Sequence, residues 1–507
     1  MVRPVHALVR SLVVGSLTAA FALPVAAPSF AQDTQQLRVG AAALPPGRGN
    51  PYKGVGAPHI YTWAAMFDSL VNVDLKGAAV PGLALRWTNV DRQTWRLTLR
   101  PNVRYTNGEP FNAKAVVSTF EYVTSEKGLA TLAGRNFRGY AAREIDDLTV
   151  EIRTEAPNPI VPNVLASLVP LAPKAWADGG DDGYSAQPAS TGPYRLESWA
   201  GETANLAAFG GSWRAPKVAR LTIIALPERA ARLQAFVSGQ VEIMVQPSTD
   251  DVPAIRSAGH AVDVAPGPLT TAVGLVQEGP KALAPFKDKR VRQALNYAVD
   301  KEALNRDLLA GLYHPASQPS NPSGFGYNES LKPYPYDPDR AKRLLSEAGY
   351  ASGFEFVIEF FGDEGDIYQR VASDLGKIGV RARINSIAVA DWLKKFNANS
   401  WEGNAFNHTF GIAPEIDAGK IFGFNSCMKE NPWYCDRSFM PNIERINSEF
   451  DPARRRAMLN EAMAWYREEA VGLYLFERPE LTAVSKRVRG FESINRAFQY
   501  DKMTLVP

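Results

Sequence analysis

The stretch WRLTLRPNVRYTNGEPFNAKAV, residues 95–116, gives the first indication of the fold class. Its first five residues alternate large apolar side chains with Arg96 and Thr98, which is typical of a half-buried β-strand. Compact strand patterns recur at residues 148–152 and 221–226. The first half of the chain is therefore predicted to be rich in strands.

Helix signals are as clear in the second half. Residues 290–299 place apolar side chains at helical spacing, which predicts a helix with one buried face and with Arg290, Arg292 and Asn296 on the other. Asp337-Pro338 and Asp451-Pro452 each have the pattern of an N-cap followed by a first helical residue. Because strands and helices interleave, the sequence predicts an α/β chain with parallel or mixed sheets.

Stretches rich in Pro, Gly, Asn and Ser divide these elements. Loops are expected at residues 157–159, 179–183 and 315–338. A break at Gly267-Pro268, followed by the apolar residues 272–276, suits a segment that crosses between two lobes. At 507 residues the chain is long enough for more than one globular domain.

The first 31 residues are typical of a signal peptide. Arg3 and Arg10 precede an acid-free apolar stretch, and Ser29-Phe30-Ala31 offers small residues for cleavage before Gln32. The chain has 56 basic and 53 acidic residues, so its charge is nearly balanced. That balance argues against nucleic acid or an anionic membrane as the main partner. No later stretch reaches the roughly 18 apolar residues of a membrane span.

The only two cysteines, Cys427 and Cys435, lie close together in sequence. In an exported protein this spacing predicts a disulfide that closes a short loop and contributes roughly 2–3 kcal/mol. Two free buried thiols are the alternative.

Enzyme and metal motifs are nearly absent. The sequence has no His-Glu-x-x-His, Gly-x-Ser-x-Gly or phosphate-binding glycine loop, and its histidines after residue 31 are scattered. We therefore expect no metal, cofactor or catalytic residue. Ser426-Cys427-Met428-Lys429 does fit the Ser-x-x-Lys of penicillin-binding enzymes, so an exported serine hydrolase is the alternative of a different class. The Lys-Thr-Gly that should accompany that motif is missing.

Several strings in order resemble the bacterial extracellular solute-binding proteins of the dipeptide, oligopeptide and nickel type, which are receptors of ABC importers. The matching strings are residues 66–71, 81–87, 95–116, 190–194, 289–300 and 336–349. The resemblance implies a two-lobed periplasmic binding protein fold of the α/β class, with mixed sheets and an extra subdomain inserted in the first lobe. It implies a first lobe at residues 32–61, 190–268 and 476–507, an insertion at 62–189, and a second lobe at 269–475.

The resemblance also indicates where a ligand would bind. Peptide-binding members carry an Asp-Pro in the second lobe, and its Asp can pair with a peptide amine. The corresponding segment here is residues 411–417, where Ala413 replaces that Asp. Glu415 or Asp417 could take over as the counter-charge, or both acids could simply face solvent or cap the next helix.

Aromatic and amide side chains are dense around this segment and suit flat or hydrogen-bonding ligand surfaces. We expect ligand contacts from the second-lobe residues Trp401, Asn404, Phe406, Asn407 and Phe410. From the first lobe we expect Tyr52 and Trp63.

The sequence thus predicts a periplasmic, monomeric and non-catalytic subunit of an ABC importer. Its partners would be a small-molecule ligand and the membrane permease. A peptide or similar amide-bearing nutrient is the first hypothesis for the ligand. An oligosaccharide, another small organic compound and a nickel chelate are alternatives.

Overall fold

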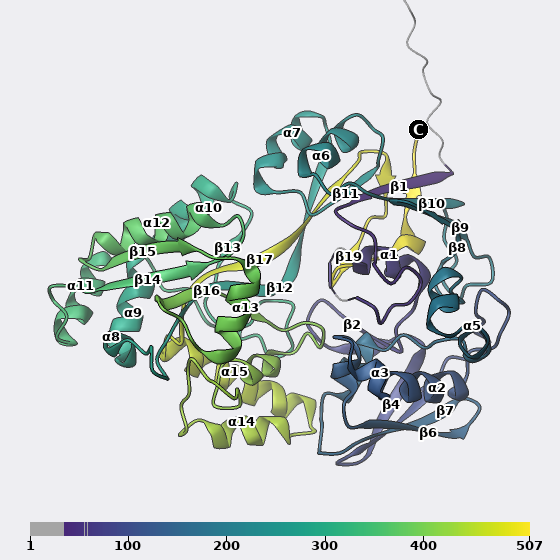
Figure 1. Cartoon of the computed structure of the whole chain (residues 1–507), viewed down its shortest axis with the longest axis horizontal. Coiled ribbons are helices and arrows are strands. Elements are labelled where there is room, and N and C mark those ends of the chain that lie inside the picture. Colours follow the sequence, from purple (N-terminus) through teal and green to yellow (C-terminus); the bar gives the residue numbers. More distant parts are fainter. Residues whose placement is uncertain (1–34, 55, 58) are drawn as a thin grey trace, which may run out of the picture.

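The computed structural model describes residues 35–54, 56, 57 and 59–507. The expected signal peptide lies outside these residues. Two lobes share one mixed sheet with the strand order β15-β14-β16-β12-β17-β11-β1-β10-β9-β8, and β13 pairs with β17 beside it (Figure 1). The first lobe holds β1 (Gln36–Ala41), β8 (Tyr194–Ala200), β9 (Thr203–Ala208), β10 (Arg220–Ala225) and β11 (Ile243–Val245). The second lobe holds β13 (His314–Pro315), β14 (Glu355–Phe360), β15 (Arg381–Ser386) and β16 (Asn404–Gly411).

Strands β12 (Ala261–Leu275) and β17 (Gly472–Val484) run antiparallel through both lobes. Their pairing shifts between Ala265 and Leu269, so Gly267-Pro268 lies where the register changes. A Cβ at Gly267 would overlap the carbonyl oxygen of Arg478, which explains the glycine. We propose lobe boundaries at residues 268/269 and 475/476, inside these two crossing strands.

The insertion in the first lobe is built on a second antiparallel sheet. Its order is β4 (Ala84–Asp91), β5 (Thr94–Leu99), β7 (Thr149–Thr154) and β6 (Tyr140–Asp146), and α2 (Ala113–Val123) contacts β6 and β7. The strands predicted at 95–99, 148–152 and 221–226 are β5, β7 and β10, so these predictions are confirmed. Helix α1 (His59–Met66) runs unbroken through Thr62. We therefore propose that the insertion begins after Met66.

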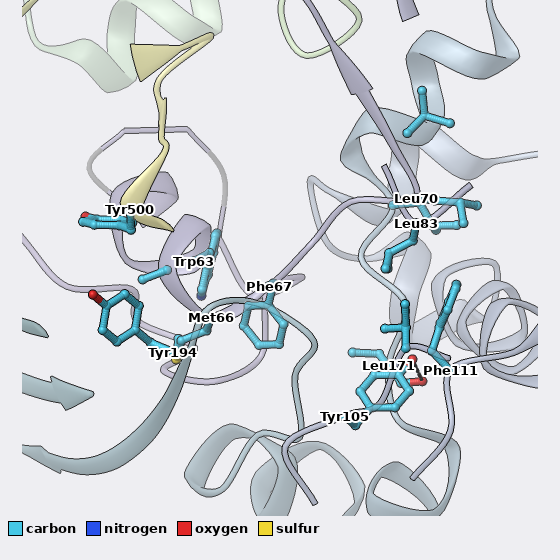
Figure 2. Close-up of a cluster of buried hydrophobic side chains, with 14 of the residues drawn as sticks. Trp63, Met66, Phe67, Leu70, Leu83, Tyr105, Phe111, Leu171, Tyr194 and Tyr500 are labelled. Carbon is cyan, nitrogen blue, oxygen red and sulfur yellow. Dashed lines mark hydrogen bonds between the residues drawn. The ribbon is translucent and has the colours of Figure 1, made fainter. Parts of the chain in front are cut away.

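One hydrophobic core joins the insertion to the rest of the first lobe. Figure 2 shows side chains of α1, including Trp63 and Met66, beside Tyr194 and Tyr500, and the cluster continues to Tyr105 in the insertion. The hydroxyl of Tyr500 donates to the carbonyl oxygen of Tyr61 at 3.0 Å. The C-terminal segment thus returns to complete the first-lobe core.

Helices surround the second-lobe part of the sheet. They are α8 (Ala284–Lys287), α9 (Lys289–Ala298), α10 (Lys301–Leu308), α11 (Pro338–Glu347), α12 (Gly365–Gly376), α13 (Val389–Ala398), α14 (Met440–Asn447) and α15 (Pro452–Glu468). The predicted N-caps are confirmed, because Asp337 accepts from Arg340 N and Asp451 accepts from Arg454 N, each at 2.8 Å. These caps satisfy main-chain donors that a helix start leaves unpaired.

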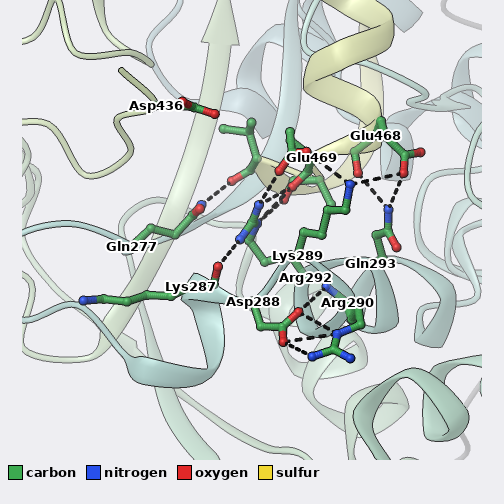
Figure 3. A network of polar contacts seen from close by, with 12 residues as sticks. Gln277, Lys287, Asp288, Lys289, Arg290, Arg292, Gln293, Asp436, Glu468 and Glu469 are labelled. Atoms are coloured by element: carbon green, nitrogen blue, oxygen red, sulfur yellow. Dashed lines mark hydrogen bonds and ion pairs between the residues drawn. The ribbon is translucent and has the colours of Figure 1, made fainter. Parts of the chain in front are cut away.

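Helix α9 differs from the prediction of one apolar and one polar face. Arg292 and Asn296 are both buried. Arg292 donates to the carbonyl oxygens of Phe286 and Glu469, so it ties α9 to the end of α15 (Figure 3). Asn296 donates to the carbonyl oxygen of Gly472 at 3.0 Å and accepts from Tyr474 N at 3.1 Å. Polar side chains can lie inside here because main-chain groups distant in sequence pair with them.

The prediction of a loop at residues 179–183 is wrong. Helix α5 (Pro173–Ala186) continues on both sides of this segment, and Gly180 alone leaves the helical conformation, with φ 55° and ψ −159°. A single glycine at positive φ is enough to kink the helix.

The remaining elements are short. They are β2 (Val71–Val73), β3 (Ala79–Pro81), α3 (Glu126–Leu129), η1 (Gly134–Phe137), α4 (Val161–Val164), η2 (Leu165–Ser167), α6 (Arg229–Val237), η3 (Thr249–Asp251), α7 (Val252–Ser257), η4 (Ala418–Gly423), β18 (Val488–Arg489), β19 (Ser493–Ile494), β20 (Ala497–Phe498), η5 (Tyr500–Lys502) and β21 (Thr504–Leu505). Among the described residues, no helix is both long and apolar enough to cross a bilayer.

The lobes also meet away from the crossing strands, at what we call the inter-lobe contact. It joins Gly77, in the turn between β2 and β3, and Asn163 of α4 to Phe325 and the segment 411–417. The side-chain amide of Asn163 donates to the carbonyl oxygens of Gly77 at 2.8 Å and Glu415 at 2.9 Å. A Cβ at Gly77 would overlap Phe325 N and the carbonyl oxygen of Ile416. The two lobes therefore approach each other with main chain against main chain.

Replacing Gly77 by Ala should push the lobes apart, because the added methyl meets only backbone atoms of the other lobe. Gly108→Ala is the matched control, since Gly108 also has positive φ (90°, against 75° for Gly77) but an added Cβ there meets nothing within 4 Å. Both changes strain the backbone by about 1–2 kcal/mol. Small-angle X-ray scattering should show a larger radius of gyration for Gly77→Ala only. Identical curves for both variants would contradict the role of the inter-lobe contact.

Candidate functional site

The segment 411–417 leaves the end of β16 and runs between the crossing strands and the inter-lobe contact. Ile412 N donates to the carbonyl oxygen of Pro268 at 3.1 Å, next to the register shift of β12. Further along, Ile416 accepts from Phe325 N at 2.9 Å. The segment that carries both predicted acids is therefore held by main-chain bonds at each end.

Asp417 is a fully paired acid. It is 1% exposed, and its two carboxylate oxygens accept from Arg455 at 2.5 and 2.9 Å. It also accepts from Gly419 N at 2.8 Å, as the N-cap of η4. A buried carboxylate needs such partners, so the structure gives Asp417 a structural task. Its contact with a ligand stays a prediction.

Glu415 has a different environment. It is 4% exposed, and one carboxylate oxygen, Oε1, accepts from Lys420 at 2.7 Å. The other oxygen, Oε2, is buried without a hydrogen-bond partner. Glu415 thus has an acceptor left for a ligand, while Lys420 already balances its charge.

The predicted aromatic residues of the second lobe form a packed cluster. Trp401, Phe406 and Phe410 are fully buried. The rings of Trp401 and Phe406 stack at 4.1 Å with an interplanar angle of 3°. These three side chains have no solvent-exposed surface, so in this structure they act as core packing. Their contact with a ligand remains a prediction.

The two amides of β16 lie at different places. Asn404 begins the strand and donates to the carbonyl oxygen of Lys281 at 2.7 Å. Segment 411–417 follows the other end of β16. At the rise of a β-strand, that end is about 20 Å from Asn404, so Asn404 does not lie beside Glu415. Asn407 donates to the carbonyl oxygen of Phe361 at 3.3 Å, and its side-chain oxygen is buried without a partner.

The predicted first-lobe residues are engaged within their own lobe. The Tyr52 hydroxyl donates to the carbonyl oxygen of Val169 at 2.7 Å and accepts from Val169 N at 3.0 Å. Trp63 donates from its indole nitrogen to the carbonyl oxygen of Arg48 at 3.1 Å. Neither residue joins Glu415 in the structure.

The residue that sequence reasoning missed is Asn163, which connects the first lobe to Glu415. Nothing in the local sequence Val161-Pro162-Asn163-Val164 identifies it, because its partners lie 86 and 252 residues away. Glu477 was also missed; it stands in β17 together with two other charged residues, Arg478 and Glu480, so its charge alone did not mark it.

The disulfide prediction is confirmed. Cys427 and Cys435 are bonded, with their Cα atoms 4.5 Å apart. Next to them, the Ser426 hydroxyl donates to the carbonyl oxygen of Phe422, while Lys429 donates to the carbonyl oxygens of Asn397 and Asn431. No hydrogen bond joins the Ser426 hydroxyl to the Lys429 side-chain amine, and an amine that activates the hydroxyl would need one.

Two surface hollows of about 430 and 620 Å³ lie on the sheet of the insertion, and no residue of segment 411–417 lines either of them. The larger is lined by Arg96 and Arg143, both paired with Glu151 at 2.6 and 2.7 Å. In the part of the chain that the structure describes, no group of three or more His, Cys, Asp or Glu side chains could hold a metal ion.

Comparison with known proteins gives a consistent result. The model of the family described as bacterial extracellular solute-binding proteins, family 5 Middle, matches residues 78–415. The glutathione-binding protein GsiB of Salmonella typhimurium is 29% identical over 311 residues, which are 59% of each chain. The dipeptide-binding protein of Escherichia coli K12 is 23% identical over 458 residues, 81% of this chain and 83% of that protein. The match thus spans about three fifths of the glutathione-binding relative.

The fold is also similar to solved structures. HbpA2 from Haemophilus parasuis superposes with a TM-score of 0.82 at 21% identity, over 93% of this chain and the whole of that one. This likeness confirms the predicted two-lobed α/β fold.

His408, in the aromatic cluster, should make the fold sensitive to acid. Burial lowers the pKa of His408 to about 4, against the opposing hydrogen bond with Asn425. The unfolded chain therefore binds more protons between pH 6.5 and pH 4, and the free energy of unfolding should fall across this range by up to about 3 kcal/mol.

Urea unfolding at several pH values checks this expectation. His408→Asn should flatten the pH dependence of the unfolding free energy, whereas His314→Asn, at an exposed site, should keep the wild-type slope. Equal slopes for wild type and His408→Asn would disprove it.

Proposed function

Because the chain belongs to family 5 of the bacterial extracellular solute-binding proteins, we propose that it is the ligand-capturing subunit of an ABC importer. It works in the periplasm after removal of residues 1–31, as a monomer and without catalysis. It encloses a small peptide or similar amide-bearing solute between its lobes and delivers that solute to the membrane permease. The family match over residues 78–415 is the observation that carries this proposal.

The geometry supports a receptor that closes around its ligand. Two strands connect the lobes at their register shift, and such paired strands can act as a hinge. On the other side, Asn163 and Gly77 touch the main chain around Glu415. A ligand that contacts this segment and the first lobe would favour the closed state by its contacts to both.

The relatives named as glutathione- and dipeptide-binding proteins favour a peptide-like ligand. Glu415 offers its unpaired oxygen to an N–H group of such a ligand, for example a peptide amide. Lys420 neutralises the carboxylate, so this acceptor suits an uncharged donor.

Ligand binding should raise thermal stability, because the ligand binds the folded state and not the unfolded chain. The gain is about 2.7 kcal/mol at a hundredfold excess over the dissociation constant. We would screen dialanine, trialanine, reduced glutathione, maltotriose and a nickel–histidine complex by melting temperature. A shift with at least one peptide is expected. A shift with only the sugar or the metal complex would overturn the peptide assignment.

Glu415→Gln should weaken binding of the peptide found in that screen by about tenfold, since a charged acceptor contributes more than a neutral one. Its unfolding free energy should change little. Asp417→Asn is the comparison: loss of the buried pair with Arg455 should cost about 3–5 kcal/mol of stability. Titration calorimetry and urea unfolding separate the two effects. Unchanged affinity in Glu415→Gln would remove Glu415 from the site.

A further inference from the structure

Glu477 lies in the middle of β17, at the crossing between the lobes. Residues 477–479 are the only partly exposed part of this otherwise buried strand. Glu477 pairs with Thr270 of β12 on one side and with His314 of β13 on the other, and Thr270 pairs in turn with Phe410 of β16. Directly paired residues present their side chains on the same face of a sheet.

That face also carries a hydrophobic cluster that includes one buried residue of the first lobe. Phe410 belongs to the hydrophobic cluster that also contains Ile416 of segment 411–417 and Val73 of the first lobe. Phe410, Thr270 and Glu477 are neighbours on three adjacent strands. They therefore connect this cluster to the place where β12 and β17 cross between the lobes.

In the described part of the chain, no ion pair joins Glu477 to a Lys, Arg or His side chain, and its strand neighbour His314 forms none with it. Its one hydrogen bond comes from the Tyr327 hydroxyl, 2.8 Å from Oε1. The neighbouring acids all have a cation: Glu415 has Lys420, Asp417 has Arg455, Glu364 has Arg478 and Glu480 has Arg496. Burial raises the pKa of Glu477 to about 7, while the bond from Tyr327 opposes this rise. A partly buried acid without a counter-charge, between two lobes, is typical of functional sites.

Unpaired neutral groups lie close to the same crossing. Thr270 is fully buried and its hydroxyl has no partner. Ser320 and Asn321 each have an unpartnered polar atom, in the buried loop that leads to Tyr327. Ser323 of this loop donates to the carbonyl oxygen of Gly267 at 3.3 Å, which places the loop against β12. Each unpaired buried group costs about 1–3 kcal/mol, so a set of them indicates a missing partner.

We propose that Glu477 and Thr270 form a subsite for a protonated amine of the bound solute. An ammonium group has three N–H donors, which can meet the Glu477 carboxylate and the Thr270 hydroxyl together. Tyr327 fixes the carboxylate by its hydrogen bond and is a positioning residue. Glu415 cannot fill this role equally well, because Lys420 would repel a second cation. The inference rests on the proposed function and identifies the ligand as a cationic amine.

The test compares trialanine with N-acetyl-trialanine, which differ by one ammonium group. Titration calorimetry at about pH 7.5 keeps most of Glu477 ionised and most of the peptide amine protonated. Wild type should prefer trialanine, and Glu477→Gln should bind trialanine about ten- to a hundredfold more weakly while its affinity for the acetylated peptide stays the same. Thr270→Val, which removes only the hydroxyl, should show the same selective loss to a smaller degree.

Glu480→Gln is the matched control, since Glu480 is a buried acid on the same strand that pairs with Arg496. It should lose stability and keep the preference for the free amine. Glu477→Gln keeps a side chain that can accept from Tyr327, so its melting temperature should not fall.

Each outcome decides between the proposals. If wild type binds both peptides equally, or if Glu477→Gln and Thr270→Val leave the preference intact, the amine subsite is wrong and the peptide function stands. If wild type binds neither trialanine nor the other peptides of the screen, the peptide function fails, and the amine subsite fails with it.

Discussion

The main-chain pairing of β12 with β17 is the constraint on which the rest of the structure depends. These strands place the sheets of both lobes in one hydrogen-bonded order, so neither lobe can move without bending the same ladder. Two register shifts interrupt that ladder, one beside Gly267 and one between Thr271 and Ala272. Bending is easiest where regular pairing is already lost. Three residues with unpaired polar atoms, Thr270, Ser320 and Asn321, lie near these shifts.

The inter-lobe contact limits the same motion from the other side. Its bonds link main-chain atoms, through Asn163 and the turn at Gly77, and do not depend on charged side chains. Salt screens charge pairs far more than buried hydrogen bonds. The approach of the lobes at this contact is therefore set by shape more than by charge.

Local patterns were enough to predict much of the fold. The strand at residues 95–99 and the caps at Asp337 and Asp451 depend on neighbours within a few residues, which the sequence displays. The disulfide between Cys427 and Cys435 is local in the same sense. The prediction of a polar face on α9 was wrong because the partners of its polar residues are distant in sequence. Arg292 is satisfied by carbonyl oxygens 177 residues away, and no pattern around it announces them.

The candidate site shows the same difference between local partners, which the sequence reveals, and distant partners, which it does not. Glu415 and Asp417 are two residues apart and look equivalent in the sequence. Their different environments come from Arg455 and Lys420, of which only Lys420 is near in sequence. Sequence could locate the segment, through its resemblance to a family, but not the charge that each acid retains after folding.

Charge compensation, more than the presence of an acid, decides what ligand chemistry a buried carboxylate can serve. A carboxylate that already holds a cation gains little from a second one and must lose part of the first bond. A carboxylate with only a phenol as partner keeps its full field in a region of low dielectric. Glu415 and Glu477 differ in this respect, because Lys420 pairs with Glu415 whereas Glu477 has only the Tyr327 hydroxyl. Under the proposed function, a solute that carries both an amide N–H and an ammonium group would suit the two carboxylates, the first at Glu415 and the second at Glu477.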